Sequence, residues 1–179
     1  IGVVVTHSHP DHYGLARRIK AATSAWIGLH PAERTLITVD AAERRQRLDE
    51  IATWLRRCGA PAVELARLEA EIGELEAALA NIEPDVALTD GMPVPGTDGG
   101  LVALHTPGHT QDSMCLVIED RVFTGDTLLI GGTGRTDLPT GDPHALYESL
   151  FDKLLRLDPA TLVYPAHDYK GRTESTIGH

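Results

Sequence analysis

Short apolar runs mark both ends of the chain, and polar or glycine-rich residues follow each of them. Residues 1–6 form a β-branched run that is typical of a buried strand, and residues 24–30 predict a second short strand. Between them, Pro10 stands where helices favour proline in their first turn, and apolar residues recur on one face as far as residue 23. The beginning of the chain therefore predicts a strand, a helix and a strand.

The middle of the chain has a helical pattern instead. Apolar residues recur every three or four positions over residues 40–83, with glutamates between them, and the segment CGAP at 58–61 interrupts the run. This pattern predicts an amphipathic helical hairpin, although the run is shorter than the roughly three or four heptads that identify a coiled coil. We expect a structural or lid element that packs on the domain or on a partner chain and supplies no catalytic group.

The last third of the chain returns to strands, with a helix before the final one. A glycine- and proline-rich loop at 90–100 precedes them, and Glu119–Asp120 fits a two-residue hairpin turn. The expected strands are residues 101–106, 114–118, 121–126 and 161–167, and the expected helix is near 143–156. Strands on both sides of helices predict a layered α/β (α+β) protein with mostly antiparallel sheets. Residues 1–179 suffice for one domain.

Composition narrows the classes of partner. The chain has 16 basic and 26 acidic residues, a formal net charge of −10, which argues against a nucleic acid or an anionic membrane as the main partner. An anionic substrate stays open, because a metal or a few arginines can override the global field. The two cysteines form no CxxC pair, so we expect neither a disulfide framework nor a cysteine-rich zinc site.

The sequence also carries a weak signal about location. No apolar run approaches the ~20 residues of a membrane span, and no signal peptide is visible. The chain opens on Ile1 in the middle of an expected strand, so we expect a fragment or a processed chain. We expect a cytoplasmic protein, or one of an organellar matrix if a targeting segment is missing.

Four of the expected strands each deliver a histidine or an aspartate at or just beyond their ends. These residues are His7, His109, Asp126 and His167, and His9, Asp11 and His12 follow the first of them closely. If the strand ends share one rim of the sheets, the seven side chains converge. Neutral imidazole and carboxylate suit zinc, iron and manganese. Histidines that cap strands or fill the core would explain single positions but not the whole set, so the sequence predicts a metal site.

The segments THSHPDH, HTPGHT, FTGD and YPAHD resemble, in order and context, the motif series of the metallo-β-lactamase superfamily. The resemblance implies an αββα sandwich with the metal site on the rim between its two sheets. It also implies that this sequence begins after the first strands of the fold. In the family's two-metal pattern, one metal takes His7, His9 and His109. The other takes Asp11, His12 and His167, and Asp126 bridges the two.

The segments GRTD at 134–137 and HDYKG at 167–171 resemble the persulfide dioxygenases of the ethylmalonic encephalopathy group. That resemblance implies one Fe(II) on His7, His109 and Asp126, and oxidation of glutathione persulfide by O₂ to sulfite and glutathione. Around the iron, the implied residues that orient ligands and move protons are His9, Asp11, His12, His167 and Asp168, the last by holding the tautomer of a ligand histidine.

Basic and aromatic residues of the same segments are candidates for gripping the glutathione carboxylates. They are Arg135, Tyr169, Lys170 and Arg172. Arginine suits this task because its guanidinium binds a carboxylate through two parallel hydrogen bonds. In the alternative, Arg135 pairs with Asp137 and braces its loop, while Lys170 and Arg172 are solvated surface charges.

The helical hairpin lengthens the chain between His12 and His109 beyond the persulfide dioxygenase pattern and keeps a second enzyme class open. That class is a hydrolase with two Zn(II) ions that cleaves a thioester such as a hydroxyacylglutathione, using a bridging hydroxide whose pKa the metals lower. A non-enzymatic third alternative is a metal-binding or dimerising remnant. In either enzyme the expected partner is a small thiol or persulfide substrate derived from glutathione. If the chain forms an oligomer, we expect a homodimer.

Overall fold

The computed structural model describes residues 1–34, 41–78 and 82–179. Its first sheet has the strand order β1 (Gly2–Val4), β2 (Trp26–Leu29), β3 (Val86–Ala87), and all its neighbours are parallel. Helices α1 (Pro10–Tyr13) and α2 (Ala16–Thr23) connect β1 to β2. A strand–helix–strand connection returns the chain in the same direction, so the expectation of mostly antiparallel sheets is wrong for this sheet.

The second sheet has five strands in the order β10-β9-β6-β5-β4. Their bounds are β4 Leu101–His105, β5 Met114–Ile118, β6 Arg121–Gly125, β9 Leu162–Pro165 and β10 Ser175–Thr176. The turn between β5 and β6 falls at Glu119–Asp120 as predicted, with Glu119 at φ 49°. Strand β9 pairs with β6 in parallel, because a helical segment carries the chain back between them.

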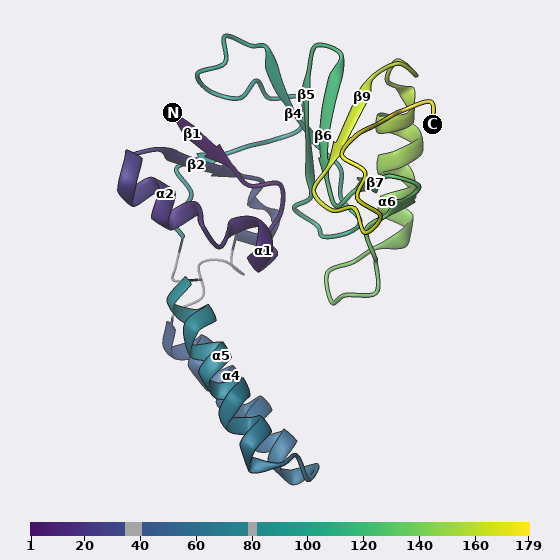
Figure 1. Ribbon diagram of the computed structural model, residues 1–179. Coiled ribbons are helices and arrows are strands. Elements are labelled where there is room, and N and C mark those ends of the chain that lie inside the picture. Colours follow the sequence, from purple (N-terminus) through teal and green to yellow (C-terminus); the bar gives the residue numbers. More distant parts are fainter. Residues whose placement is uncertain (35–40, 79–81) are drawn as a thin grey trace.

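That helical segment begins as α6 (Pro143–Glu148) and continues as a π-helical turn, η2 (Ser149–Lys153), and a 3-10 turn, η3 (Leu154–Arg156). It covers the outer face of the second sheet, where Leu154 packs with Cys115, Val122 and Val163. Helices α1 and α2 lie on the opposite side of the molecule, next to β1 and β2 (Figure 1). The layers are therefore helices, sheet, sheet and helix, which confirms the predicted αββα sandwich.

The predicted helical hairpin is present as α4 (Ala41–Arg57) and α5 (Ala62–Ala78), with the break at the predicted glycine–proline segment. A 3-10 turn, η1 (Pro31–Glu33), precedes it. The two helices run side by side and extend away from the sheets (Figure 1). Buried Ala52 and Leu65 lie within the hairpin, and Arg56 pairs with Glu69 across it at 2.5 Å. The ends of the predicted 40–83 segment fall partly outside the described residues.

Two smaller features differ from the sequence prediction. The helix expected over residues 10–23 is divided at Gly14 and Leu15 into α1 and α2. The structure adds a short hairpin of β7 (Leu128–Leu129) and β8 (Gly132–Thr133). Strands of two residues are too short to show a predictive pattern in the sequence. Among the helices of the described ranges, none is long and apolar enough to cross a membrane.

Candidate metal centre

The strand ends bring the predicted side chains together. Strand β1 leads to His7, and the backbone N–H of Met114 donates to the carbonyl of Thr6, which joins this end to β5. The pairing of Gly125 with Pro165 places the ends of β6 and β9 side by side. Asp126 and His167 follow these ends directly, so the common rim expected from the sequence is present.

Three histidines form one tight group of nitrogen atoms. Nε2 of His7 lies 3.0 Å from Nδ1 of His9, and Nε2 of His109 lies 3.1 Å from the same nitrogen. A carboxylate oxygen of Asp126 lies 3.5 Å from Nε2 of His109. The donor atoms of the three histidines all lie within 4.8 Å of one another, which is the spacing of ligands around one ion.

A second group adjoins the first. Nε2 of His12 and Nε2 of His167 are 3.2 Å apart, and an oxygen of Asp11 is 3.5 Å from the former and 3.2 Å from the latter. Asp126 lies between the two groups, with oxygens 3.8 Å from Nε2 of His12 and 3.6 Å from Nε2 of His167. All seven predicted side chains are therefore within reach of one or two ions.

The chemistry of this donor set fits a cation. Burial lowers the pKa of His7 to about 2, and the neighbouring ring of His12 adds to the shift. Burial also lowers the pKa of His9 and of His12, so the rings offer neutral nitrogens, the form that binds metal. Oδ1 of Asp126 is buried and has no hydrogen-bond partner among the described residues. An unpartnered carboxylate oxygen among neutral imidazoles is a group that a metal ion would satisfy.

Hydrogen bonds on the far side of the rings orient the candidate ligands. Nδ1–H of His109 donates to the carbonyl of Arg135 at 2.8 Å, which leaves Nε2 free to face the centre. The hydroxyl of Thr6 lies 3.3 Å from Nδ1 of both His7 and His12. Such outer contacts fix the tautomer of a metal-binding histidine. Sequence reasoning missed Thr6, whose position at the end of the apolar run was its only signal.

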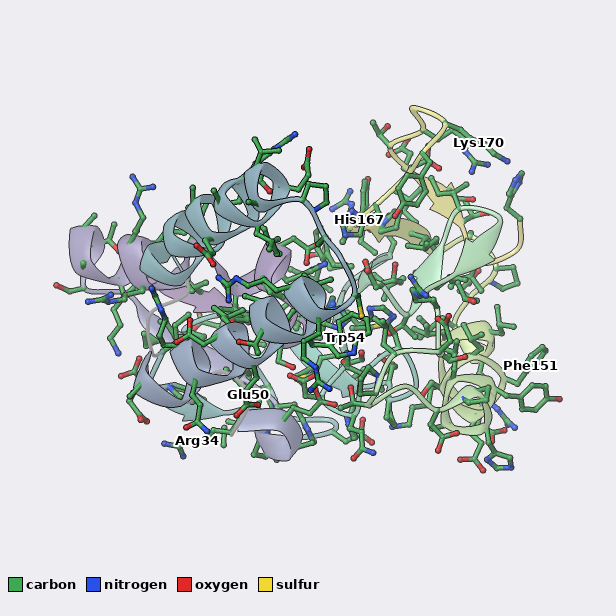
Figure 2. The ribbon with its side chains drawn as sticks, turned by 90° about the horizontal axis from the view of Figure 1, so that it is seen from below. Arg34, Glu50, Trp54, Phe151, His167 and Lys170 are labelled. Carbon is green, nitrogen blue, oxygen red and sulfur yellow. The ribbon has the colours of Figure 1, made fainter. Side chains whose placement is uncertain are left out.

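The candidate substrate-binding residues lie at the surface near the centre. Arg135 binds both oxygens of Asp137, at 2.6 and 2.7 Å, so the bracing ion pair considered from the sequence is present. The exposed Tyr169 ring lies parallel to the His167 ring with centroids 6.3 Å apart. Lys170 is exposed on the same loop. Figure 2 shows Lys170 and His167 on the same side of the molecule.

Asp168 and Arg172 are occupied with each other. An oxygen of Asp168 accepts from the Arg172 guanidinium at 2.9 Å, and the other accepts from the backbone N–H groups of Arg172 and Lys170. These bonds, led by the backbone bond from Arg172, lower the pKa of Asp168. Arg172 also donates to the carbonyl of Ile130. In the described structure the two side chains thus fix the loop at 168–172. The Asp168 carboxylate accepts hydrogen bonds from this loop, and not from a histidine ring as the resemblance implied.

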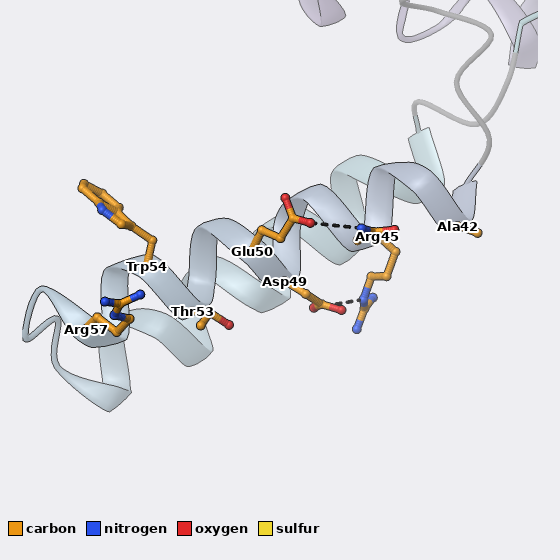
Figure 3. Close-up of a pocket in the computed structure, with 8 residues that line it drawn as sticks. Ala42, Arg45, Asp49, Glu50, Thr53, Trp54 and Arg57 are labelled. Carbon is orange, nitrogen blue, oxygen red and sulfur yellow. Dashed lines mark hydrogen bonds and ion pairs between the residues drawn. The ribbon is translucent and has the colours of Figure 1, made fainter.

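A hollow of about 600 Å³ lies elsewhere, along one face of α4 (Figure 3). Its lining includes Arg45, Asp49, Thr53 and Trp54, all from this one helix. Arg45 pairs with Asp49 at 3.7 Å within the helix. None of the seven side chains of the candidate metal centre lines this hollow, so the two features are separate.

Comparisons with known proteins agree with the geometry. A sequence profile described as the metallo-β-lactamase superfamily matches residues 1–167. Mitochondrial persulfide dioxygenase ETHE1 of Homo sapiens is 40% identical over 101 residues, which span 55% of this chain and 40% of the human protein. The match therefore covers less than half of that relative.

Two solved protein structures match the structure of this chain along almost its whole length. ETHE1 from Myxococcus xanthus has a TM-score of 0.65 and 30% identity, covering 99% of this chain and 58% of its own. TTHA1623, solved in a di-iron-bound form, has a TM-score of 0.68 and 28% identity, covering 99% of this chain and 72% of its own.

Proposed function

Because the chain belongs to the metallo-β-lactamase superfamily, we propose that it is a persulfide dioxygenase that holds one Fe(II). The proposed substrate is glutathione persulfide. In the reaction, the terminal sulfur is oxidised by O₂, water supplies the third oxygen of sulfite, and glutathione is released. The protein would recognise a small anionic thiol derivative and no macromolecule.

One observation carries this proposal. The chain is 40% identical over 101 residues to the human persulfide dioxygenase ETHE1, and its structure matches that of ETHE1 from Myxococcus xanthus along 99% of its own length. The centre supports the same chemistry, because two histidines and one carboxylate are the ligand set of many oxygen-activating iron enzymes.

His7, His109 and Asp126 would hold the iron in this proposal. Fe(II) held there would supply the redox chemistry towards O₂. Thr6 and the carbonyl of Arg135 keep the two rings in place through the bonds described above. Nδ1 of His9 lies 3.0 Å from Nε2 of His7 and 3.1 Å from Nε2 of His109, so it would stand beside the iron, where it could hold a proton for the bound substrate.

The remaining polar residues would handle protons and substrate. Asp11, His12 and His167 lie within 3.5 Å of one another and offer a relay at the edge of the centre. We propose that Arg135 and Lys170 contact the glutathione carboxylates, with Tyr169 alongside. Asp168 and Arg172 would support this surface by fixing the loop that carries Lys170 and Tyr169.

The deciding experiment is oxygen consumption by the anaerobically iron-loaded chain after addition of glutathione persulfide. We expect O₂ uptake matched one to one by sulfite. A chain that binds a full equivalent of iron but consumes no O₂ would contradict the proposal.

A second candidate function is hydrolysis of a thioester by two zinc ions. The observation that favours it is the group of Asp11, His12 and His167, which offers a second set of ligands with Asp126 between the two. The di-iron form of TTHA1623 points in the same direction. Release of thiol from a hydroxyacylglutathione by the zinc-loaded chain, without O₂ uptake by the iron-loaded chain, would favour this alternative.

A further inference from the structure

Glu33 is a buried acid that the candidate metal centre does not use. It ends the 3-10 turn η1 just after β2, and only 5% of it is exposed. A buried carboxylate destabilises a fold unless hydrogen bonds or a charge compensate for the water it has lost. The partners of Glu33 therefore indicate why the fold keeps this acid.

Each oxygen of Glu33 accepts a hydrogen bond from a different loop. Oε2 accepts from the hydroxyl of Ser8 at 2.9 Å, and Oε1 accepts from the backbone N–H of Gln111 at 2.8 Å. Ser8 stands between His7 and His9, while Gln111 lies two residues beyond His109. One carboxylate thus joins the loop after β1 to the loop after β4.

We propose that Glu33 is a positioning residue that sets the spacing of the His7, His9 and His109 nitrogens. The inference concerns the centre on which the proposed function rests, but it requires only metal binding. The two loops come from different sheets, so their relative position is not fixed by a shared strand ladder. Ligands must be held to within ~0.5 Å for a metal to bind well, and a two-pronged contact between the loops supplies such a constraint.

A second buried acid completes the network. Asp112, 1% exposed, accepts from the hydroxyl of Thr110 at 2.8 Å, while its Oδ2 has no partner among the described residues. Burial raises the pKa of Asp112 to about 6, and the nearby charge of Glu33 contributes to the shift. Asp112 directly follows Gln111, so this second acid adjoins the end of the bridge that Glu33 makes to the loop after β4.

The test compares metal affinity in variants that remove one or both prongs. Ser8→Ala removes only the hydroxyl that donates to Glu33, with little change in volume. Glu33→Ala removes the hydrogen bonds to both Ser8 and Gln111. Glu33→Gln keeps the shape and one carbonyl acceptor for Gln111. Val163→Ala is the control, because it leaves a cavity in the core beneath η2 and η3, at a residue outside the network.

Zinc and cobalt affinities of the full chain are measured by competition with a chromogenic chelator. We expect Glu33→Ala to weaken metal binding by about 10- to 100-fold, with smaller losses for Ser8→Ala and Glu33→Gln. The visible spectrum of bound Co(II) should change in these variants, because the ligand geometry changes. Val163→Ala should lower the melting temperature and leave the affinity and the spectrum unchanged.

Two results would overturn the inference. One is a wild-type affinity and Co(II) spectrum in Ser8→Ala, which decides the matter even where Glu33→Ala does not fold. The other is an equal loss of affinity in Val163→Ala, which would reduce Glu33 to a general stabiliser. Metal affinity and the Co(II) spectrum do not depend on turnover. A chain that consumes no O₂ would therefore contradict the proposed function without affecting this inference.

Discussion

At the scale of single residues, Gly134 shows how tightly the centre is packed. A Cβ atom at this position would overlap the carbonyl oxygen of Asp126 and lie 2.8 Å from Nδ1 of His109. Gly134→Ala should therefore displace both candidate ligands or break the bond from His109 to the Arg135 carbonyl. We expect a loss of zinc affinity of about 10- to 100-fold, measured by chelator competition.

Gly132→Ala is the matched control for that change. It lies two residues away, and an added Cβ would meet no atom within 4 Å. Its metal affinity should equal that of the wild type. A wild-type metal affinity in Gly134→Ala as well would mean that the loop moves away without cost, and that Gly134 does not constrain the centre.

Asp126 offers a second prediction at this scale, because its two effects have opposite signs. Asp126→Ala removes the carboxylate that lies between the two groups of histidines, so we expect high-affinity metal binding to be lost. In the metal-free protein the same change removes a buried oxygen without a partner among the described residues, so the melting temperature should stay level or rise. Equilibrium dialysis and thermal melts after chelator treatment measure the two effects. Full metal occupancy in the variant would contradict the assignment.

The residues that the sequence identified are those whose chemistry is visible in the chain itself. Histidines and aspartates beyond strand ends predict a metal site because few other roles require them all. Thr6 leaves no such signal, because a threonine at the end of an apolar run has many other roles besides contacting His7 and His12. Glu33 leaves none either, since its importance comes from contacts with Ser8 and Gln111, which are distant in the chain. The sequence likewise left two roles open for Arg135. The structure shows its ion pair with Asp137, while its contact with the substrate stays a proposal.

At the scale of elements, the helical hairpin should be an independent unit of stability. Leu65 of α5 is 5% exposed, whereas Trp54 of α4 is 62% exposed. Leu65→Ala should cost about 2–3 kcal/mol of local stability, and Trp54→Ala less than about 1 kcal/mol. Hydrogen exchange of the α4 and α5 amides measures this, and Leu65→Ala should accelerate it roughly 30-fold or more.

The amides of β5 and β6 provide the comparison for that experiment. Their exchange should be the same in both hairpin variants, because the hairpin extends away from the sheets (Figure 1). Faster exchange throughout the molecule in Leu65→Ala would show instead that the hairpin and the sheets unfold together.

Most elements could be predicted because their patterns are long enough to be seen. The hairpin and the strands β1, β2, β4, β5, β6 and β9 all coincide with predicted segments. The parallel pairing of β2 with β1 was not predicted, because strand pairing depends on how the chain returns and not on the strand's own residues. Strands β3 and β10 have two residues each, too few for an alternating pattern.

At the scale of the whole molecule, stability should depend on pH through half-buried His30 and buried Asp112, whose pKa values shift in opposite directions. Burial, together with the stacked ring of His105, lowers the pKa of His30 to about 4, while burial raises the pKa of Asp112 to about 6. The net charge of −10 also changes with pH and affects every variant alike. Differences between the wild type and a matched variant therefore isolate each group.

His30→Asn removes the titrating ring but keeps a side chain that can cap η1, as His30 does. Between pH 6.5 and about 4, the unfolded chain binds a proton at His30 that the folded chain does not. The free energy of unfolding of the wild type should therefore fall relative to His30→Asn as the pH falls. Since the ring is partly exposed, we expect about 1–2 kcal/mol across this window.

Asp112→Asn should give the opposite slope. Between pH 3.8 and about 6, folded Asp112 keeps a proton that the unfolded chain has lost, so the wild type loses stability as the pH rises. Above pH 6 the variant should be more stable than the wild type by roughly 2–3 kcal/mol, because an amide carries no charge to bury beside Glu33. Urea denaturation of metal-free protein from pH 4.5 to 8 measures both differences. Parallel curves for wild type and Asp112→Asn would mean that water or a shift of Glu33 already compensates the buried charge.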